Sequence, residues 1–82
     1  MMSETLGERI RKARIEYGMS QAELARRIKI TTQSMNQIEM GKISDPAASR
    51  VREIARVLKV SADYLLGLKD KMESFLKPAT AA

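Results

Sequence analysis

Two short helices with a three-residue turn are predicted between Ser20 and Gly41, and this close spacing restricts the fold more than any other feature. Ser20 and Glu23 have the spacing of a capping box, in which each side chain accepts a hydrogen bond from the other residue's backbone amide. Thr31 supplies a second capping oxygen, so another helix is expected to begin near Thr32. The segment therefore predicts a compact helix-turn-helix unit.

These two helices have apolar positions that can pack together across the turn. The positions are Leu24, Ala25, Ile28, Ile30, Met35 and Ile38. On the second helix, the side chains that point the other way are Thr32, Gln33, Asn36 and Gln37. None of the four is charged, whereas a helix face made only for solubility usually carries Glu and Lys.

Such a face has the chemistry needed to read bases in DNA. Asparagine and glutamine can bond adenine through two hydrogen bonds, and the methyl group of threonine can contact the methyl group of thymine. The free backbone amides at the start of the helix favour nearby phosphates. The alternative is an ordinary polar, solvated surface, because Gln and Asn are common on helix surfaces.

The rest of the chain also predicts helices. Leu6, Ile10, Ala13 and Tyr17 recur at helical spacing before Gly18, which predicts a helix over about 5–17. A fourth helix is expected over about 46–58, with Asp45 as N-cap and Pro46 at the first position. Its buried side chains should be Ala48, Val51, Ile54, Ala55 and Leu58. Ser61 caps a short fifth helix, over 62–66, which Gly67 ends.

Composition limits the function classes that remain. The 82 residues suit one domain, and with only 4% aromatic residues its core must be mainly aliphatic. Cysteine and histidine are both absent, so we expect no disulfide, no metal site, no cofactor and no enzymatic activity. No apolar run is long enough for a membrane span and no signal peptide is evident, so we expect a cytoplasmic protein without membrane contact.

The net charge of +5 implies attraction to polyanions, either nucleic acid or an anionic membrane surface. The basic residues are spread along the chain, so any basic stripe must be assembled by folding. Arg9, Arg11 and Lys12 could contribute to such a stripe, although each taken singly is typical of a solvated helix face.

The segment QAELARRIKITTQSMNQIEMG, with LGERIRKARIEYGMS before it and VSADYLLG after it, resembles the lambda repressor and Cro family, the Xre-type regulators. The resemblance implies an all-α, five-helix, lambda-repressor-like DNA-binding domain over residues 1–67. In this family the helix that matches 32–40 enters the major groove. The base-reading candidates by position are Thr32, Gln33, Asn36 and Gln37, and the phosphate-binding candidates are Gln21, Lys42 and Ser44.

The resemblance also implies an ion pair between Arg14 and Glu39, which would tie the first helix to the recognition helix; the alternative is that both are solvated charges. Two positions depart from the family pattern. Lys29 stands where a glycine is usual, so either the turn is adjusted or a strained backbone is tolerated. Met40 stands where relatives often have a polar residue, and it could pack inward or touch a thymine methyl group.

Residues 68–82 form an extension beyond the resemblance. Leu68, Met72, Phe75 and Leu76 make an apolar stripe, which predicts a sixth amphipathic helix that ends before Pro78. The stripe could pair with a second subunit or a partner protein, dock on its own domain, or remain frayed. The residues after Pro78 are expected to be disordered.

Together these features predict a sequence-specific transcriptional regulator, a repressor, that binds double-stranded DNA. It would read a pseudo-palindromic operator in the major groove as a homodimer. The alternative function is a DNA-binding antitoxin or a protein-interaction adaptor that uses the extension at 68–82 to hold a partner protein.

Overall fold

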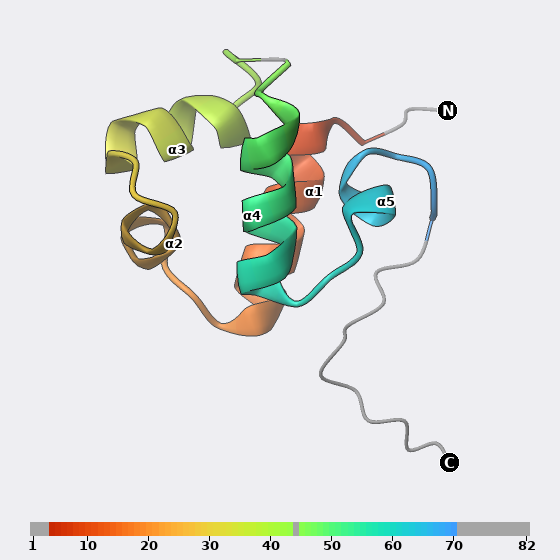
Figure 1. The fold of residues 1–82 in the computed structure, drawn as a ribbon, viewed down its shortest axis with the longest axis horizontal. Coiled ribbons are helices and arrows are strands. Elements are labelled where there is room, and N and C mark those ends of the chain that lie inside the picture. The colour runs from red at the N-terminus through yellow and green to blue at the C-terminus, as the bar shows by residue number, and fades with distance from the viewer. Residues whose placement is uncertain (1–3, 44, 71–82) are drawn as a thin grey trace.

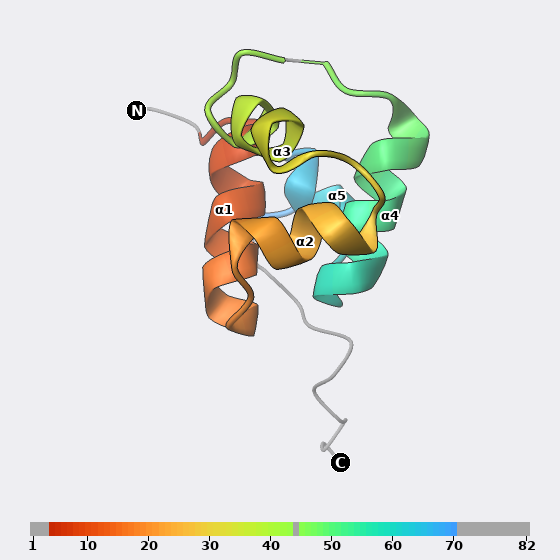
Figure 2. The same cartoon turned by 90° about the vertical axis from the view of Figure 1, so that its left-hand side faces the viewer.

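A computed structural model describes residues 4–43 and 45–70 of the chain. They form five α-helices, as expected: α1 (Leu6–Tyr17), α2 (Gln21–Arg27), α3 (Thr32–Glu39), α4 (Ala48–Leu58) and α5 (Ala62–Leu65). Figures 1 and 2 show α2 and α3 together on one side of the domain and α5 on the opposite side. The predicted sixth helix lies almost wholly outside the described residues, and residues 68–70 are not helical.

The core is aliphatic, and all five helices contribute to it. The largest fully buried side chains are Ile10, Leu24, Met35, Ile54, Leu58 and Leu65. Tyr64 is the aromatic residue in the core cluster. Because every helix places at least one of these side chains in the same cluster, the hydrophobic effect fixes the positions of all five relative to one another.

The helix caps agree only in part with the prediction. Ser20 Oγ accepts from the Glu23 amide at 3.0 Å, as expected, but the return bond of the capping box is not made. The Glu23 carboxylate instead pairs with Arg26 at 2.6 Å and with Arg27 at 2.9 Å. The Glu23 carboxylate therefore binds two guanidinium groups of its own helix and not the Ser20 amide. The hydrogen bond from Arg26, and after it the one from Arg27, lowers the pKa of the Glu23 carboxyl.

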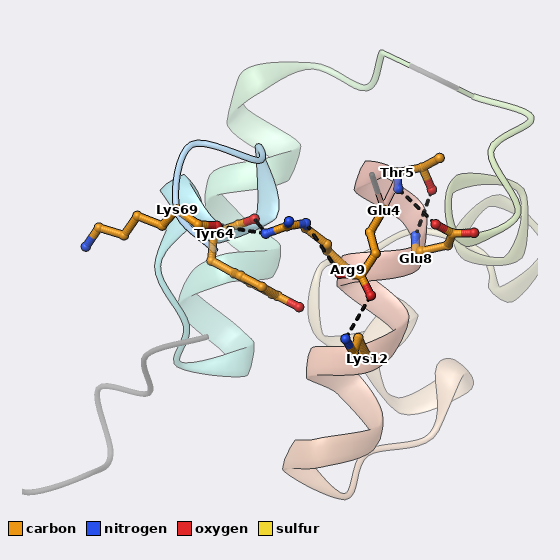
Figure 3. A network of polar contacts seen from close by, with 7 residues as sticks. All are labelled: Glu4, Thr5, Glu8, Arg9, Lys12, Tyr64 and Lys69. Carbon is orange, nitrogen blue, oxygen red and sulfur yellow. Dashed lines mark hydrogen bonds and ion pairs between the residues drawn. The ribbon is translucent and has the colours of Figure 1, made fainter. Parts of the chain in front are cut away.

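A complete capping box occurs instead at the start of α1, where the sequence reading did not place one. Thr5 Oγ1 accepts from the Glu8 amide at 3.1 Å, and the Thr5 amide donates to Glu8 Oε1 at 2.9 Å (Figure 3). The box fixes the direction in which the chain enters α1.

The predicted start of α4 is wrong by two residues. Ala47 is the N-cap, with φ −56° and ψ 145°, and Asp45 and Pro46 lie outside the helix. The helical hydrogen bonds begin at the Ala47 carbonyl, which accepts from the amides of Arg50 and Val51. Ala48, predicted to be buried, is exposed because it lies in the first turn, beyond the edge of the core. The four other predicted positions are buried.

The turn between α2 and α3 has the strained backbone at Lys29 that was one of the two predicted alternatives. Lys29 has φ of 63°, in the left-handed region that favours glycine. The following amide, of Ile30, donates to the Ala25 carbonyl at 3.0 Å, which closes the end of α2. The turn is therefore not adjusted to its lysine.

Of the helices in the described part of the chain, none has both the length and the apolar character needed to cross a membrane.

Candidate nucleic-acid interface

The helix α3 has two distinct sides. Met35 and Ile38 are buried against α2 and the rest of the core. On the other side, Thr32, Gln33 and Asn36 are exposed and Gln37 is half-buried. The four uncharged side chains predicted to read bases are therefore exposed or half-buried. The helix that carries them, α3, lies with α2 on the side of the domain that faces the viewer in Figure 2.

Met40 is the C-cap residue of α3. It is 63% exposed, so the alternative in which it packs inward is wrong. The chain then turns at Gly41, and the Lys42 amide donates to the Gln37 carbonyl at 2.9 Å. This bond holds Lys42, which is exposed, directly beside the end of α3. Ser44, the other phosphate candidate in this loop, lies outside the described residues.

Arg14 on α1 contacts Glu39 on α3 through two hydrogen bonds. Arg14 Nε lies 2.7 Å from Glu39 Oε2, and Arg14 Nη2 lies 3.0 Å from Glu39 Oε1. Arg14 Nη1 also donates to the Met19 carbonyl at 3.0 Å. The Glu39 side chain is only 2% exposed, so the alternative of two solvated charges does not hold. The pair fixes α3 to α1, and its two parallel hydrogen bonds restrict the orientation of one helix relative to the other.

Gln21, at the first position of α2, belongs to the same cluster. Its Nε2 donates to Glu39 Oε1 at 3.1 Å, and its Oε1 accepts from Asn36 Nδ2 at 3.4 Å. The sequence reading gave Gln21 a phosphate contact only and did not foresee these two bonds. The phosphate contact stays a prediction for this half-buried side chain, whose amide is already hydrogen-bonded to Glu39 and Asn36.

The α1 helix approaches the end of α3 very closely, at Gly7. A Cβ atom at this position would lie 2.4 Å from the carbonyl oxygens of both Ile38 and Glu39. Sequence reasoning missed Gly7, because a glycine in the first turn of a helix is otherwise only a weak helix former. Glycine is required here by the packing of two backbones.

Arg9 does not contribute to a basic stripe. It is buried at the end of the domain away from α2, where its Nη1 donates to the Tyr64 carbonyl at 3.0 Å and to the Lys69 carbonyl at 2.8 Å. Its guanidinium lies over the Tyr64 ring, 4.7 Å from the centroid, and its Nε lies 3.6 Å from Glu4 Oε1 (Figure 3). The prediction for Arg9 is therefore wrong, because α5 folds over this position.

The two neighbouring basic residues of α1 are at the surface. Lys12 pairs with Glu4 at 2.8 Å, and this hydrogen bond lowers the pKa of the Glu4 carboxyl and raises the pKa of the Lys12 ammonium. Arg11 is exposed.

Burial raises the pKa of the nearby Tyr64 hydroxyl. Across residues 4–43 and 45–70, no group of three or more acidic, histidine or cysteine side chains could hold a metal ion.

Of the four apolar positions predicted to contact a partner, only Leu68 lies in the described part of the chain. Its side chain is 73% exposed. Met72, Phe75 and Leu76 lie outside the described residues. The dimer or partner contact of this stripe stays a prediction.

Comparison with known proteins gives a consistent result. Residues 7–71 match the family described as "Helix-turn-helix domain". The transcriptional regulator for conjugative element R391 of Providencia rettgeri is 46% identical over 63 residues, which are 76% of this chain and 28% of that protein. The chain spans 28% to 61% of the length of the curated relatives it matches.

Two solved structures have the same arrangement of helices. The P22 c2 repressor in complex with synthetic operator 9T is 28% identical, with a TM-score of 0.71, over 78% of this chain and 96% of that one. SinR, the master regulator for biofilm formation, in complex with DNA is 30% identical, with a TM-score of 0.70, over 74% and 97%. The chain therefore belongs to the helix-turn-helix family, in its lambda-repressor-like, Xre-type branch.

Proposed function

We propose that this chain is a sequence-specific DNA-binding transcriptional regulator, a repressor, that inserts α3 into the major groove. The observation that carries the proposal is the exposed, uncharged face of Thr32, Gln33 and Asn36, opposite buried Met35 and Ile38. The donors and acceptors of such side chains match base edges in the major groove. The net charge of +5 favours a polyanion, and the P22 c2 repressor and SinR were solved with DNA.

We propose further that the chain acts in the cytoplasm and binds as a homodimer, with two α3 helices in successive major grooves about 34 Å apart. The exposed Leu68 and the stripe that follows it in sequence are the candidate dimer contact. Repression needs no catalytic group, because occupation of promoter DNA is sufficient. The same stripe would hold a partner protein if the chain is an antitoxin or an adaptor.

Two substitutions separate the reading of bases from the attraction to phosphates. Gln33→Ala should relax the choice of base at particular positions of DNA selected in vitro, by roughly 1–3 kcal/mol per lost contact. Lys42→Ala should weaken binding to every sequence and reduce the slope of log affinity against log salt by about one. The measurement is the affinity of each variant for selected and random duplexes at several salt concentrations.

Arg56→Ala is the matched control for charge, because Arg56 is exposed on α4 and pairs only loosely with Glu53, at 3.7 Å. It removes the same charge as Lys42→Ala and should leave the salt slope unchanged.

The mass of the complex with selected DNA should correspond to two chains per site. Equal affinity of the unmodified chain for selected and random DNA would overturn the proposal.

A further inference from the structure

The orientation of the Gln21 amide is fixed by the buried carboxylate beside it. Glu39 Oε1 accepts from Arg14 Nη2 at 3.0 Å and from Gln21 Nε2 at 3.1 Å. An ionised carboxylate offers only acceptors, so Gln21 must turn its NH2 group toward it. The reverse orientation would place the Gln21 carbonyl oxygen against the carboxylate, with no proton between the two oxygens. Chemistry therefore allows Gln21 one orientation.

The same reasoning continues to Asn36. With its NH2 group on Glu39, Gln21 turns its carbonyl oxygen toward Asn36, whose Nδ2 lies 3.4 Å away. Asn36 must turn its nitrogen toward this oxygen, because the opposite rotation would bring two acceptors together. Its own carbonyl oxygen and its second N–H are then left for a ligand. Asn36 therefore donates to Gln21, and Gln21 donates to Glu39.

We propose that Glu39 and Gln21 act as positioning residues that fix the amide orientation of Asn36 and so set its base preference. This inference rests on the proposed function. With its carbonyl oxygen presented to the major groove, Asn36 selects a base that offers an amino group, which is adenine through N6 or cytosine through N4. Guanine O6 and thymine O4 are acceptors, so they can use only the second N–H of Asn36 and leave its carbonyl oxygen without a donor, which makes them less favourable at the same position.

Gln33 provides an internal contrast on the same helix. It is exposed, and its side chain forms no hydrogen bond with residues 4–43 or 45–70. Its amide can therefore rotate to suit either a donor or an acceptor on the base. Of Gln33 and Asn36, only Asn36 is hydrogen-bonded to the cluster of Arg14, Glu39 and Gln21. Loss of Gln21 should therefore change the base preference of Asn36 and leave that of Gln33 unchanged.

The test compares base preferences of variants by in-vitro selection. Asn36→Ala identifies the base pair that Asn36 reads, and Gln33→Ala identifies a different one. Gln21→Ala should reduce the preference for an amino-bearing base at the Asn36 position by roughly threefold to tenfold, the effect of one hydrogen bond. It should leave the preference at the Gln33 position unchanged. A lower affinity for all sequences with both preferences intact would make Gln21 a phosphate contact only and overturn the proposal.

A second substitution in the Gln21→Ala variant tests whether the base preference can be restored, a result that general destabilisation cannot imitate. The carboxylate of Asn36→Asp is an acceptor in either rotation, so it does not depend on Gln21 for its orientation. In the double variant with Gln21→Ala, the preference for an amino-bearing base should return, although overall affinity falls through repulsion from phosphate. Failure of the preference to return would contradict the orienting role.

The free protein tests the cluster independently of DNA. The side-chain amide resonances of Asn36 should shift in Gln21→Ala and should not shift in Gln33→Ala. An unchanged Asn36 signal in Gln21→Ala overturns the proposal whatever the protein binds. A shifted signal, combined with no sequence preference in the unmodified chain, would instead overturn the proposed function and with it the base preference assigned to Asn36.

Discussion

Gly7→Ala is expected to lower the free energy of unfolding by about 3 kcal/mol, the upper part of the range for overpacking. The new Cβ atom would lie 2.4 Å from the carbonyl oxygens of Ile38 and Glu39. Both obstacles are backbone atoms, so no side-chain rotation relieves the contact, and α1 must move away from the end of α3. This expected loss already includes the higher helix propensity of alanine, which offsets about 1 kcal/mol of the steric cost. Urea unfolding followed by circular dichroism measures the loss.

Gly67→Ala is the matched control for this substitution. Gly67 has φ of 83°, and a Cβ atom there would meet nothing within 4 Å. The control therefore carries only the cost of a left-handed backbone, about 1–2 kcal/mol. If the two alanine variants unfold at the same urea concentration, the close approach of α1 to α3 is not a determinant of stability.

Arg14→Ala is expected to lower the free energy of unfolding by about 3–5 kcal/mol, because it leaves a buried carboxylate without its cation. The Glu39 side chain is 2% exposed and loses two hydrogen bonds, and the Met19 carbonyl loses a third. Gln21 alone remains as a donor to Glu39. The substitution should therefore loosen the attachment of α3 to α1 as well as lower the melting temperature.

Arg26→Ala is the control for removal of an arginine from an ion pair. Arg26 pairs with Glu23 at 2.6 Å, but its side chain is 71% exposed, so its loss should leave the melting temperature within error. The double variant Arg14→Ala with Glu39→Ala should be less destabilised than the sum of the two single variants, because it buries no unpaired charge. An unchanged melting temperature in Arg14→Ala would contradict the structural role of the pair.

The parts of the fold that the sequence predicted are those encoded locally. Thr31 and Ser61 cap the helices that follow them because each can accept from an amide two or three residues ahead. Gly18 ends α1 with φ of 85°, a conformation that glycine adopts at little cost. Apolar spacing identified which faces of α2 and α3 are buried, since this pattern needs only the helical period.

The failures have a different physical origin. The environment of Arg9 depends on Tyr64, which lies 55 residues away in the sequence, and no pattern within α1 contains that information. Gly7 is explained only by the carbonyl groups of α3, and the start of α4 depends on the backbone of Ala47 instead of on a polar cap. The environments of Arg9 and Gly7 follow from packing between elements, which a single sequence does not specify.

The candidate site divides in the same way. The exposed face of α3 follows from its helical period, so Thr32, Gln33 and Asn36 could be placed at the surface from the sequence. The link from Asn36 through Gln21 to Glu39 could not, because it requires the angle and separation between α2 and α3. The resemblance to a known family supplied the pairing of Arg14 with Glu39, which composition and spacing alone do not predict.

The proposed function requires the insertion of α3 into the major groove. The measurement that tests it directly is the set of intermolecular nuclear Overhauser effects between this chain and its selected duplex. We expect contacts from the side-chain amides of Gln33 and Asn36 to major-groove base protons, with Lys42 near the backbone. Contacts made only from α1 or α5, with no signal between α3 and the bases, would contradict the insertion of α3 into the major groove.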